Sequence, residues 1–441
     1  MQRSMLQSVA DYLIVLYSFA VLGTFFCVAD QAMGHKGLLP LNATVLCIVL
    51  LLPFAARTLV PRRDNSRVRI PMVATLWANR YAVVAFLLVA LVSLALSILP
   101  GAYWSEKGKW IAVIPYGVLV TVLSLAVGLN LSVLKAIPSI AFVSLLLLSG
   151  SIWYDQLHPG TFAEITNRAA GFPGNANYAA LVANVLCAAA LNFGDRRGFQ
   201  ERCHSMLFDV LILLSTFSVV TMTMSRSGLL NFCALFALFI FFRFLRSKSS
   251  LSQRARDTFV LAATIVLAAS FLGWYATSGT PDRGNNRLSR FMNSRQVDDG
   301  SAATRLAAVY DCVEHIERAP WLGYGTGFTR TMHELPHNIY LQQWVNNGIL
   351  GIGSYLIFLA TAFATFTLRK FRNGQAIILV ATLGGIFSHN VIEQRPFLIL
   401  LGILLSHSFL VTHSIPRQLN MIRLPRRRRS DSTHEPERFA A

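Results

Sequence analysis

The sequence predicts an all-α polytopic membrane protein with about 12 transmembrane helices and a long helical loop between the ninth and tenth. Hydrophobic residues make up 54% of the 441 residues and charged residues 14%, and the mean hydropathy is +0.50. This balance is too apolar for an ordinary soluble domain. Apolar stretches long enough to cross a bilayer recur along the chain. The only long polar segment between them runs from Thr277 to Asn338.

Apolar stretches of about 18 residues or more define the predicted spans. Their approximate limits are 9–29, 38–60, 81–100, 110–129, 136–155, 177–193, 206–224, 227–245, 258–276, 348–368, 376–393 and 397–415. The first is too long for the apolar region of a signal peptide, so we interpret it as a retained signal anchor. The seventh and eighth are separated only by a short turn around Arg226.

The distribution of lysine and arginine predicts the orientation. With a cytoplasmic N-terminus, 26 of the 39 Lys and Arg residues fall in inside segments and 13 in outside segments, and seven of those 13 lie in the loop before the tenth span. An excess of basic residues in short loops marks the cytoplasmic side. We therefore expect both termini in the cytoplasm, with spans one to nine in residues 1–276, a periplasmic loop carrying the site in 277–337, spans ten to twelve in 338–415, and a basic tail in 416–441.

The formal net charge of +18 raises the possibility of nucleic-acid binding. No nucleic-acid-binding module lies outside the apolar stretches, and basic loops and the run Arg426–Arg429 are typical of contact with membrane lipids. The six cysteines show no metal-binding spacing, and Cys312 is alone in the long polar loop. We expect no nucleic acid, no disulfide framework in that loop and no cofactor.

His333, Glu334 and His337 match the H-E-x-x-H pattern of zinc peptidases, which requires both histidines on one face of a continuous helix. Pro336 lacks a backbone N–H and disfavours helix at the residue before it. We therefore interpret this stretch as a loop that ends at Pro336 and binds no metal. His337 and Asn338 then open the next helix. His337 is a candidate general base, and Asn338 can orient a ring or a substrate. The alternative is a surface histidine bonded to backbone.

Two arginines on the outer face are candidate anion ligands. Arg226 stands between Ser225 and Ser227 at a tight turn, where backbone N–H groups can also point at an anion. The alternative is an arginine that extends to outer headgroups. Arg305 lies in a predicted amphipathic helix, and the alternative for it is a solvated helix face. The stretch from Trp321 to Gly327 predicts a tight glycine-rich turn without a nucleotide-binding context.

Two further outer segments carry polar candidates. The loop before the sixth span contains two glycines, a proline and three asparagines, so we expect a structured turn with Asn175 or Asn177 capping the helix. His389 and Glu393 lie near the outer end of the eleventh span. Ionisable groups at that depth either belong to a functional site or form hydrogen bonds between helices. The sequence leaves both interpretations open.

These motifs, in this order on a twelve-span frame, resemble the O-antigen ligase and polymerase superfamily of bacterial inner-membrane proteins. The matching stretches are Gly171–Tyr178, Ser225–Leu230, Arg305 with Pro320–Gly327, and His337–Leu341. The resemblance implies a GT-C-like, metal-independent, inverting glycosyltransferase. It would move a glycan from undecaprenyl pyrophosphate to an acceptor on the periplasmic side, and for a ligase the acceptor is the lipid A-core.

The resemblance also implies roles for single residues. His337 resembles the family's catalytic histidine, and Arg226 and Arg305 resemble its phosphate-binding arginines. The predicted pyrophosphate-binding set further includes Arg290 and Arg168, and the supporting set is Asn338, Asn177, Tyr178, His389 and Glu393.

Two other functions stay open. A polymerase would share the donor chemistry, although no outer arginine here is followed by glycine eleven residues later, a spacing often seen in polymerases. A transporter of lipid-linked glycan would show charges near the membrane midplane, whereas the charges here gather at the outer surface. We therefore favour the ligase.

Overall fold

The computed structural model describes residues 76–103, 131–162, 169–193, 206–245, nine scattered residues between 255 and 270, 300–387, and 397–408 without 399 and 407. Regular structure in these ranges is helical. The main helices are α5 Arg80–Ala95, α7 Leu131–Leu157, α8 Ala176–Ala190, α9 Met206–Met222, α10 Arg226–Ile240, α13 Gly300–Arg318, α14 Ile339–Leu368 and α15 Arg372–Phe387, with short helical turns η1 Leu96–Ile98, η2 Phe241–Leu245 and η3 Phe328–Thr331.

Four of the described helical stretches are long and apolar enough to cross a membrane. They are Arg80–Ile98, Ile137–Leu157, Arg226–Arg243 and Ile339–Leu368, and α8 and α9 are shorter apolar helices. Each overlaps a span predicted from the sequence, which supports an all-α membrane protein. The predicted spans 9–29, 38–60 and 110–129, most of 258–276, and the basic tail lie outside the described residues.

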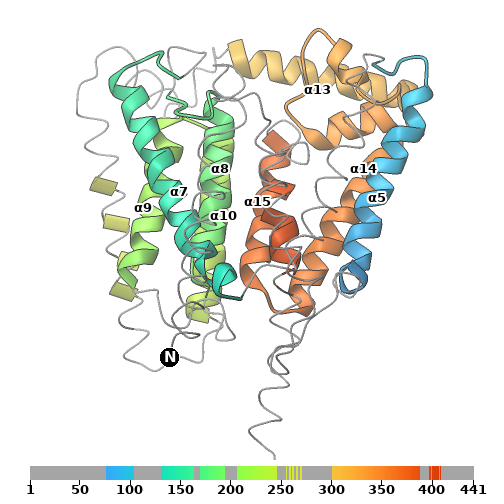
Figure 1. Ribbon diagram of the computed structural model, residues 1–441. Helices are drawn as coiled ribbons and strands as arrows, with labels where there is room; N and C mark the ends of the chain where they lie inside the picture. Colours follow the sequence, from blue (N-terminus) through green and yellow to red (C-terminus); the bar gives the residue numbers. More distant parts are fainter. Residues whose placement is uncertain are drawn as a thin grey trace, which may run out of the picture.

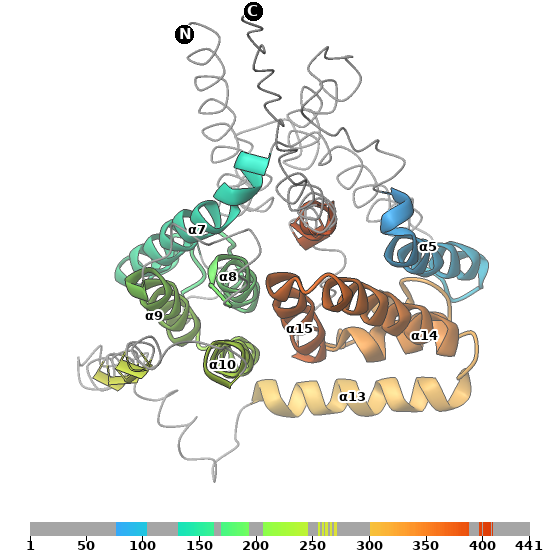
Figure 2. The ribbon, with the colours of Figure 1, turned by 90° about the horizontal axis from the view of Figure 1, so that it is seen from below.

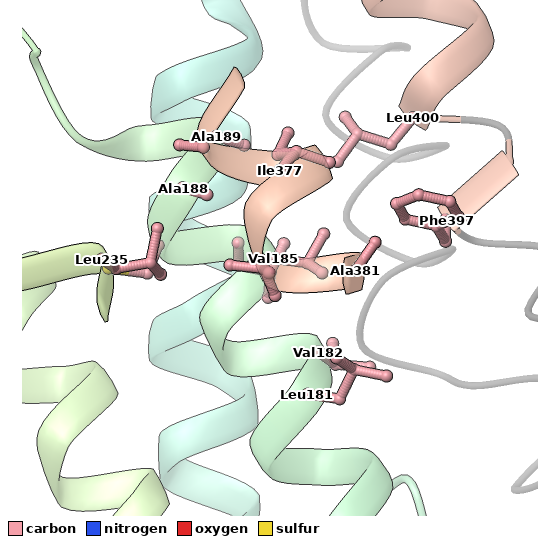
Figure 3. Packing of buried hydrophobic residues seen from close by; sticks show 14 of the residues in the cluster. Leu181, Val182, Val185, Ala188, Ala189, Leu235, Ile377, Ala381, Phe397 and Leu400 are labelled. Atoms are coloured by element: carbon pink, nitrogen blue, oxygen red, sulfur yellow. The ribbon is translucent and has the colours of Figure 1, made fainter. Parts of the chain in front are cut away.

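Helix α8 lies at the centre of one group of helices. It contacts α7, α9, α10 and α15, and 13 of its 15 residues are buried. Its many alanines let neighbouring backbones approach closely, which is how helices pack inside membranes. At Gly228 of α10, for example, an added Cβ would lie 2.6 Å from Cβ of Ala180. Leu235 of α10 and Ile377 and Ala381 of α15 converge on this helix (Figure 3).

Polar contacts at one end of the bundle tie the helix ends together. Asn373 at the start of α15 donates from Nδ2 to the carbonyl oxygens of Ala188 and Leu191 at the end of α8, each at 2.9 Å. Asp209 of α9 accepts the N–H of Asn192 at 3.0 Å and pairs with Arg243 at 3.5 Å. The C-terminal ends of α8 and α10 therefore lie beside the N-terminal ends of α9 and α15, as alternating spans require.

A second set of contacts at this end joins α14 to α5 and to the last described helical residues. The guanidinium of Arg369 donates to Asn79 Oδ1 at 2.7 Å, to Ser408 Oγ at 2.8 Å and to Ala78 O at 2.9 Å. Buried guanidinium groups are stable only when their donors are paired. Arg369 therefore holds three elements together at the side that the basic-residue count predicts to be cytoplasmic.

Helix α13 crosses the opposite end of the bundle, transverse to the spans (Figure 1). Viewed along the spans, it runs beside the bundle rather than over its centre, with its first half nearer α10 and its second half nearer α14 (Figure 2). It packs against α14. The long polar segment thus contains a helix, α13, that lies across one end of the spans. This agrees with the helical loop that the sequence predicts between two spans.

Candidate functional site

The N-terminal ends of α8, α10 and α14 lie at the same end of the bundle as α13 (Figure 1). Each begins at a residue whose side chain caps it: Asn175, Ser225 and Asn338 respectively. Unpaired N–H groups and the helix dipole make such ends positive and suited to anions. Three of them therefore raise the electrostatic potential at this end of the molecule.

The loop before α8 is fixed to α7 by hydrogen bonds to backbone. Asp155 Oδ2 accepts the N–H groups of Ala170 at 2.8 Å and Gly171 at 3.3 Å. Ser151 Oγ accepts the N–H of Phe172 at 3.2 Å. The expected structured turn is confirmed, whereas the anchoring residues Asp155 and Ser151 were missed because nothing local in the sequence links them to a loop about 15–20 residues away.

Asn175 rather than Asn177 caps α8. Its Oδ1 accepts the N–H groups of Asn177 at 3.0 Å and Tyr178 at 3.2 Å. Tyr178 packs against the apolar core. The side chain of Asn177 is therefore available to the neighbouring helix, while the predicted site residue Arg168 lies outside the described residues.

Ser225 connects the starts of α10 and α8. Its Oγ accepts the N–H of Gly228 at 3.2 Å, donates to Asn177 Oδ1 at 3.1 Å and lies 3.1 Å from Ser227 Oγ. One hydroxyl thus caps α10 and joins it to the predicted supporting residue Asn177. Arg226 is the first residue of α10, with an exposed side chain. The tight turn expected there is confirmed.

Helix α13 has the amphipathic character that the sequence predicts. Arg305, Ala308 and Cys312 lie on one helical face, where Ala308 is 3% exposed, Cys312 0% and Arg305 partly buried. Arg305 therefore belongs to the face turned toward the bundle and not to the solvated side. Burial, together with the charge of Asp311, raises the pKa of the Cys312 thiol to about 12, so this cysteine stays protonated and inert at neutral pH.

Aromatic rings join α13 to the glycine-rich turn. The His315 ring lies 5.1 Å from that of Tyr324 and 5.3 Å from that of Phe328, and the latter two stack at 4.5 Å. His315 Nδ1 also lies 2.7 Å from the carbonyl oxygen of Asp311. These contacts set the position of α13, and hence of Arg305, relative to α14.

Helix α14 is broken near its start. Gly348 has φ 61° and ψ −158°, a conformation that essentially only glycine adopts. A Cβ here would lie 2.2 Å from the carbonyl oxygen of Trp321. Past the break, Ile349 N–H donates to Pro320 O at 2.9 Å instead of to the carbonyl four residues earlier. Residues 339–347 thus form a separate first segment, which the predicted span 348–368 did not include.

The glycine-rich turn replaces the hydrogen bonds that the break removes. Tyr324 N–H donates to Val345 O at 3.0 Å, and Gly325 N–H donates to Asn346 O at 2.7 Å. In an unbroken helix both carbonyls would bond to residues four positions later. Irregular backbone at membrane depth is tolerated only where the protein itself satisfies it. The predicted tight turn is therefore confirmed, and its role at this position is to complete α14.

Buried amides brace the same junction. Asn347 Oδ1 lies 2.8 Å from Thr326 Oγ1, and its Nδ2 donates to Gln343 Oε1 at 3.1 Å. Asn346 Oδ1 accepts the N–H of Thr329 at 2.8 Å. Asn346 is 4% exposed and Asn347 1%. Sequence reasoning missed both, although two amides and a glycine directly before an apolar run were a visible signal.

His337 lies immediately before the capped start of the first α14 segment. Asn338 Oδ1 accepts the N–H groups of Tyr340 at 2.9 Å and Leu341 at 3.2 Å, so Asn338 fixes the backbone next to His337 and does not leave its oxygen for a substrate. The next residue, Ile339, is fully buried. His337 itself is partly buried at a position held on its C-terminal side by the cap.

Residues 332–338 are not helical, which confirms that the H-E-x-x-H match is a loop ending at a helix start. The side chain of His333 is 96% exposed and lies 3.7 Å from Glu334. Across the part of the chain that the structure describes, no three His, Cys, Asp or Glu side chains are grouped to hold an ion.

Helix α15 packs against two of the helices that carry or follow candidate residues. Both α10, which begins with Arg226, and α14, which follows His337, pack against it. Tyr340 Oη donates to Thr382 O at 2.8 Å, which ties the first α14 segment to α15. Arg305 lies on α13, which packs on α14. The predicted residues Arg290, His389 and Glu393 lie outside the described residues.

A family model described as O-antigen ligase matches residues 210–356. Over these residues, about a third of the chain, the sequence is similar to the O-antigen ligase family. The matched region runs from α9 into α14 and includes Arg226, Arg305, the glycine-rich turn and His337. The resemblance drawn from the motifs is thereby confirmed, and the family implies an enzyme of the ligase or polymerase type. A comparison with curated proteins finds no match.

Proposed function

We propose that the protein is an O-antigen ligase that transfers a glycan from undecaprenyl pyrophosphate to the lipid A-core of lipopolysaccharide. The observation that supports this proposal is that three capped helix N-termini, two arginines and His337 lie at the same end of an apolar bundle. A positive site at a membrane surface suits a lipid-linked pyrophosphate, and a histidine beside it suits deprotonation of a sugar hydroxyl.

In this proposal Arg226 and Arg305 hold the donor pyrophosphate. Arg226 extends from the first turn of α10, where the helix dipole adds to its charge. Arg305 lies on the bundle-facing side of α13. Guanidinium groups bind phosphate oxygens in pairs, and each charge-assisted hydrogen bond contributes about 1.5–3 kcal/mol. Arg168 and Arg290 are proposed as further ligands of the same group.

His337 is the proposed general base. It takes the proton from the acceptor hydroxyl as that oxygen attacks the anomeric carbon of the donor sugar. The bond from this carbon to the pyrophosphate oxygen breaks, and its electron pair leaves with the undecaprenyl pyrophosphate. Attack opposite the leaving group inverts the anomeric configuration.

No metal or cofactor is required in this scheme. The arginines stabilise the developing charge of the leaving group, which is the task a metal performs in many nucleotide-sugar transferases. Nucleotide sugars are not available outside the inner membrane, so the energy arrives with the lipid-linked donor. Asn177, Tyr178 and Asn338 have supporting roles through the helix starts, and His389 and Glu393 are proposed to lie behind the site.

The proposed location is the bacterial inner membrane, with the site on the periplasmic side and both termini in the cytoplasm. The count of 26 against 13 basic residues supports this orientation. The described helices also alternate in direction as the twelve-span order requires, because the ends of α8 and α10 lie beside the starts of α9 and α15.

The alternative function is that of an O-antigen polymerase, which uses the same donor and a growing chain as acceptor, and a transporter of lipid-linked glycan is less well supported. The lipopolysaccharide banding pattern of a deletion strain separates them. Loss of long chains while lipid-linked polymer persists supports the ligase, whereas single-repeat chains support the polymerase. Complementation should succeed with the His333→Ala variant and fail with His337→Ala, and equal complementation by both would refute the proposed base.

A further inference from the structure

The outer surface of α13 carries an apolar stripe that no part of the described structure covers. Leu306 is 54% exposed, Tyr310 67% and Val313 39%. With Val309, these residues follow the spacing of one helical face. Helix α13 therefore has an exposed apolar flank in addition to its buried face.

The two flanks of α13 differ in chemistry. Leu306, Val309, Tyr310 and Val313 border the bundle-facing residues on one side, and the exposed Glu317 follows them on this side near the end of the helix. The other side carries Ala307, Asp311, Glu314 and Arg318, with an ion pair between the last two. A helix lying across the ends of membrane spans has one flank toward the bilayer and the other toward water. The division into one apolar and one charged flank is typical of a helix in a membrane interface.

Further exposed apolar residues lie just past the end of α13 and on α14, a candidate membrane span. Trp321 and Leu322, just beyond the end of α13, are 72% and 48% exposed. Their backbone atoms pack on Gly348, and the next residues of α14, Ile349 and Leu350, are 40% and 49% exposed. This part of α14 belongs to a candidate membrane span, so its exposed apolar residues face lipid tails. Trp321 and Tyr310 are residue types enriched at the membrane surface.

We infer that α13 is an interfacial helix whose flank of Leu306, Val309, Tyr310 and Val313 lies in the outer leaflet of the membrane that the bundle spans. The occupant is lipid, because exposed apolar residues also lie just past the end of α13 and on the candidate span α14, and because α13 runs beside the bundle, where lipid is, rather than over its centre (Figure 2). This arrangement holds Arg305 at the depth of phosphate headgroups. The inference does not rest on the proposed transfer reaction.

Fluorescence from two adjacent positions tests this inference on the full chain. An environment-sensitive fluorescent amino acid replaces Leu306 in one variant and Ala307 in the other, and each is reconstituted in vesicles of phosphatidylethanolamine and phosphatidylglycerol. Position 306 should emit at shorter wavelength and be quenched by lipids with a nitroxide near the headgroup. Position 307, on the charged flank, should be quenched by aqueous iodide instead.

Other results would overturn the inference. Equal iodide quenching at both positions means that the stripe faces water. Protection of position 306 from both quenchers means that protein, such as a second copy of the chain, covers it. A matched pair of aspartates gives a second measurement: Leu306→Asp should expose position 310 to iodide when the probe is placed there, whereas Ala307→Asp should not. Neither readout needs glycan transfer, so the interfacial helix can fail while the proposed function stands.

Discussion

Replacement of Gly348 by alanine is the sharpest test of the broken helix. The residue has φ 61° and ψ −158°, and holding a residue with a side chain in that region costs about 1–3 kcal/mol. The new Cβ would also lie 2.2 Å from Trp321 O. This neighbour is backbone, so the glycine-rich turn would have to move as a unit.

Movement of the turn would weaken three hydrogen bonds across the break. The N–H groups of Ile349, Tyr324 and Gly325 donate to the carbonyl oxygens of Pro320, Val345 and Asn346 respectively, at 2.7–3.0 Å. Each contributes about 0.5–1.5 kcal/mol net. Together with the strain, Gly348→Ala should lower the free energy of unfolding by roughly 2.5–7.5 kcal/mol. It should also lower glycan transfer, because the first α14 segment follows His337.

The chain offers a matched control five residues later in the same helix. An added Cβ at Gly353 meets nothing within 4 Å, and alanine there favours helix by about 1 kcal/mol. Denaturant titration of the detergent-solubilised proteins should show Gly353→Ala as stable as wild type or more so. If Gly348→Ala were equally stable and active, the break and its repair by the turn would not matter, and the reasoning would be wrong.

Four further predictions concern the proposed chemistry and orientation. His337→Ala should lose at least about a hundredfold in transfer rate while purified protein still binds lipid-linked donor, and His333→Ala should be much milder; lost donor binding as the only defect would contradict a base. Arg226→Ala and Arg305→Ala should each weaken donor use about tenfold or more, with partial rescue by lysine; full activity in both alanine variants would remove the arginines from the site. Transfer by purified protein should persist in excess EDTA, and loss that Zn²⁺ restores would revive the zinc interpretation. A cysteine in place of Asp298 should react with an impermeant maleimide in intact spheroplasts, and labelling only after lysis would reverse the orientation.

Local signals in the sequence predicted the helices well where burial of apolar side chains alone determines their position. Apolar runs predicted the ends of α5, α7, α9 and α10 to within five residues, because burial in lipid determines where a span lies. The start of α14 was placed nine residues late. Its first segment carries Gln343, Asn346 and Asn347, which lower the apolar signal although all three are buried by neighbouring protein.

The site was predictable in its motifs but not in its connections. Pro336 was enough to exclude a helix through the two histidines, and the serine before Arg226 was enough to suggest a turn. By contrast, Ser225 bonds to a residue 48 positions away, and Arg369 bonds to one 290 positions away. Contacts of this kind depend on which helices are neighbours in space, and the spacing of residues along the chain does not indicate which helices these are.

Two of the three capped helix starts share an arrangement in which the motif is a pair of adjacent residues with different tasks. At Ser225–Arg226 and at His337–Asn338, one residue caps the helix with its side chain, and its neighbour is the proposed phosphate ligand or the proposed base. A cap that uses its own oxygen on backbone N–H groups cannot also bind substrate with that oxygen. The neighbouring residue, however, has its backbone held in place by the cap and lies at the positive end of a helix. Substituting a cap should therefore disturb the adjacent group's position without removing its chemistry, whereas substituting the neighbour should remove the chemistry and leave the helix intact.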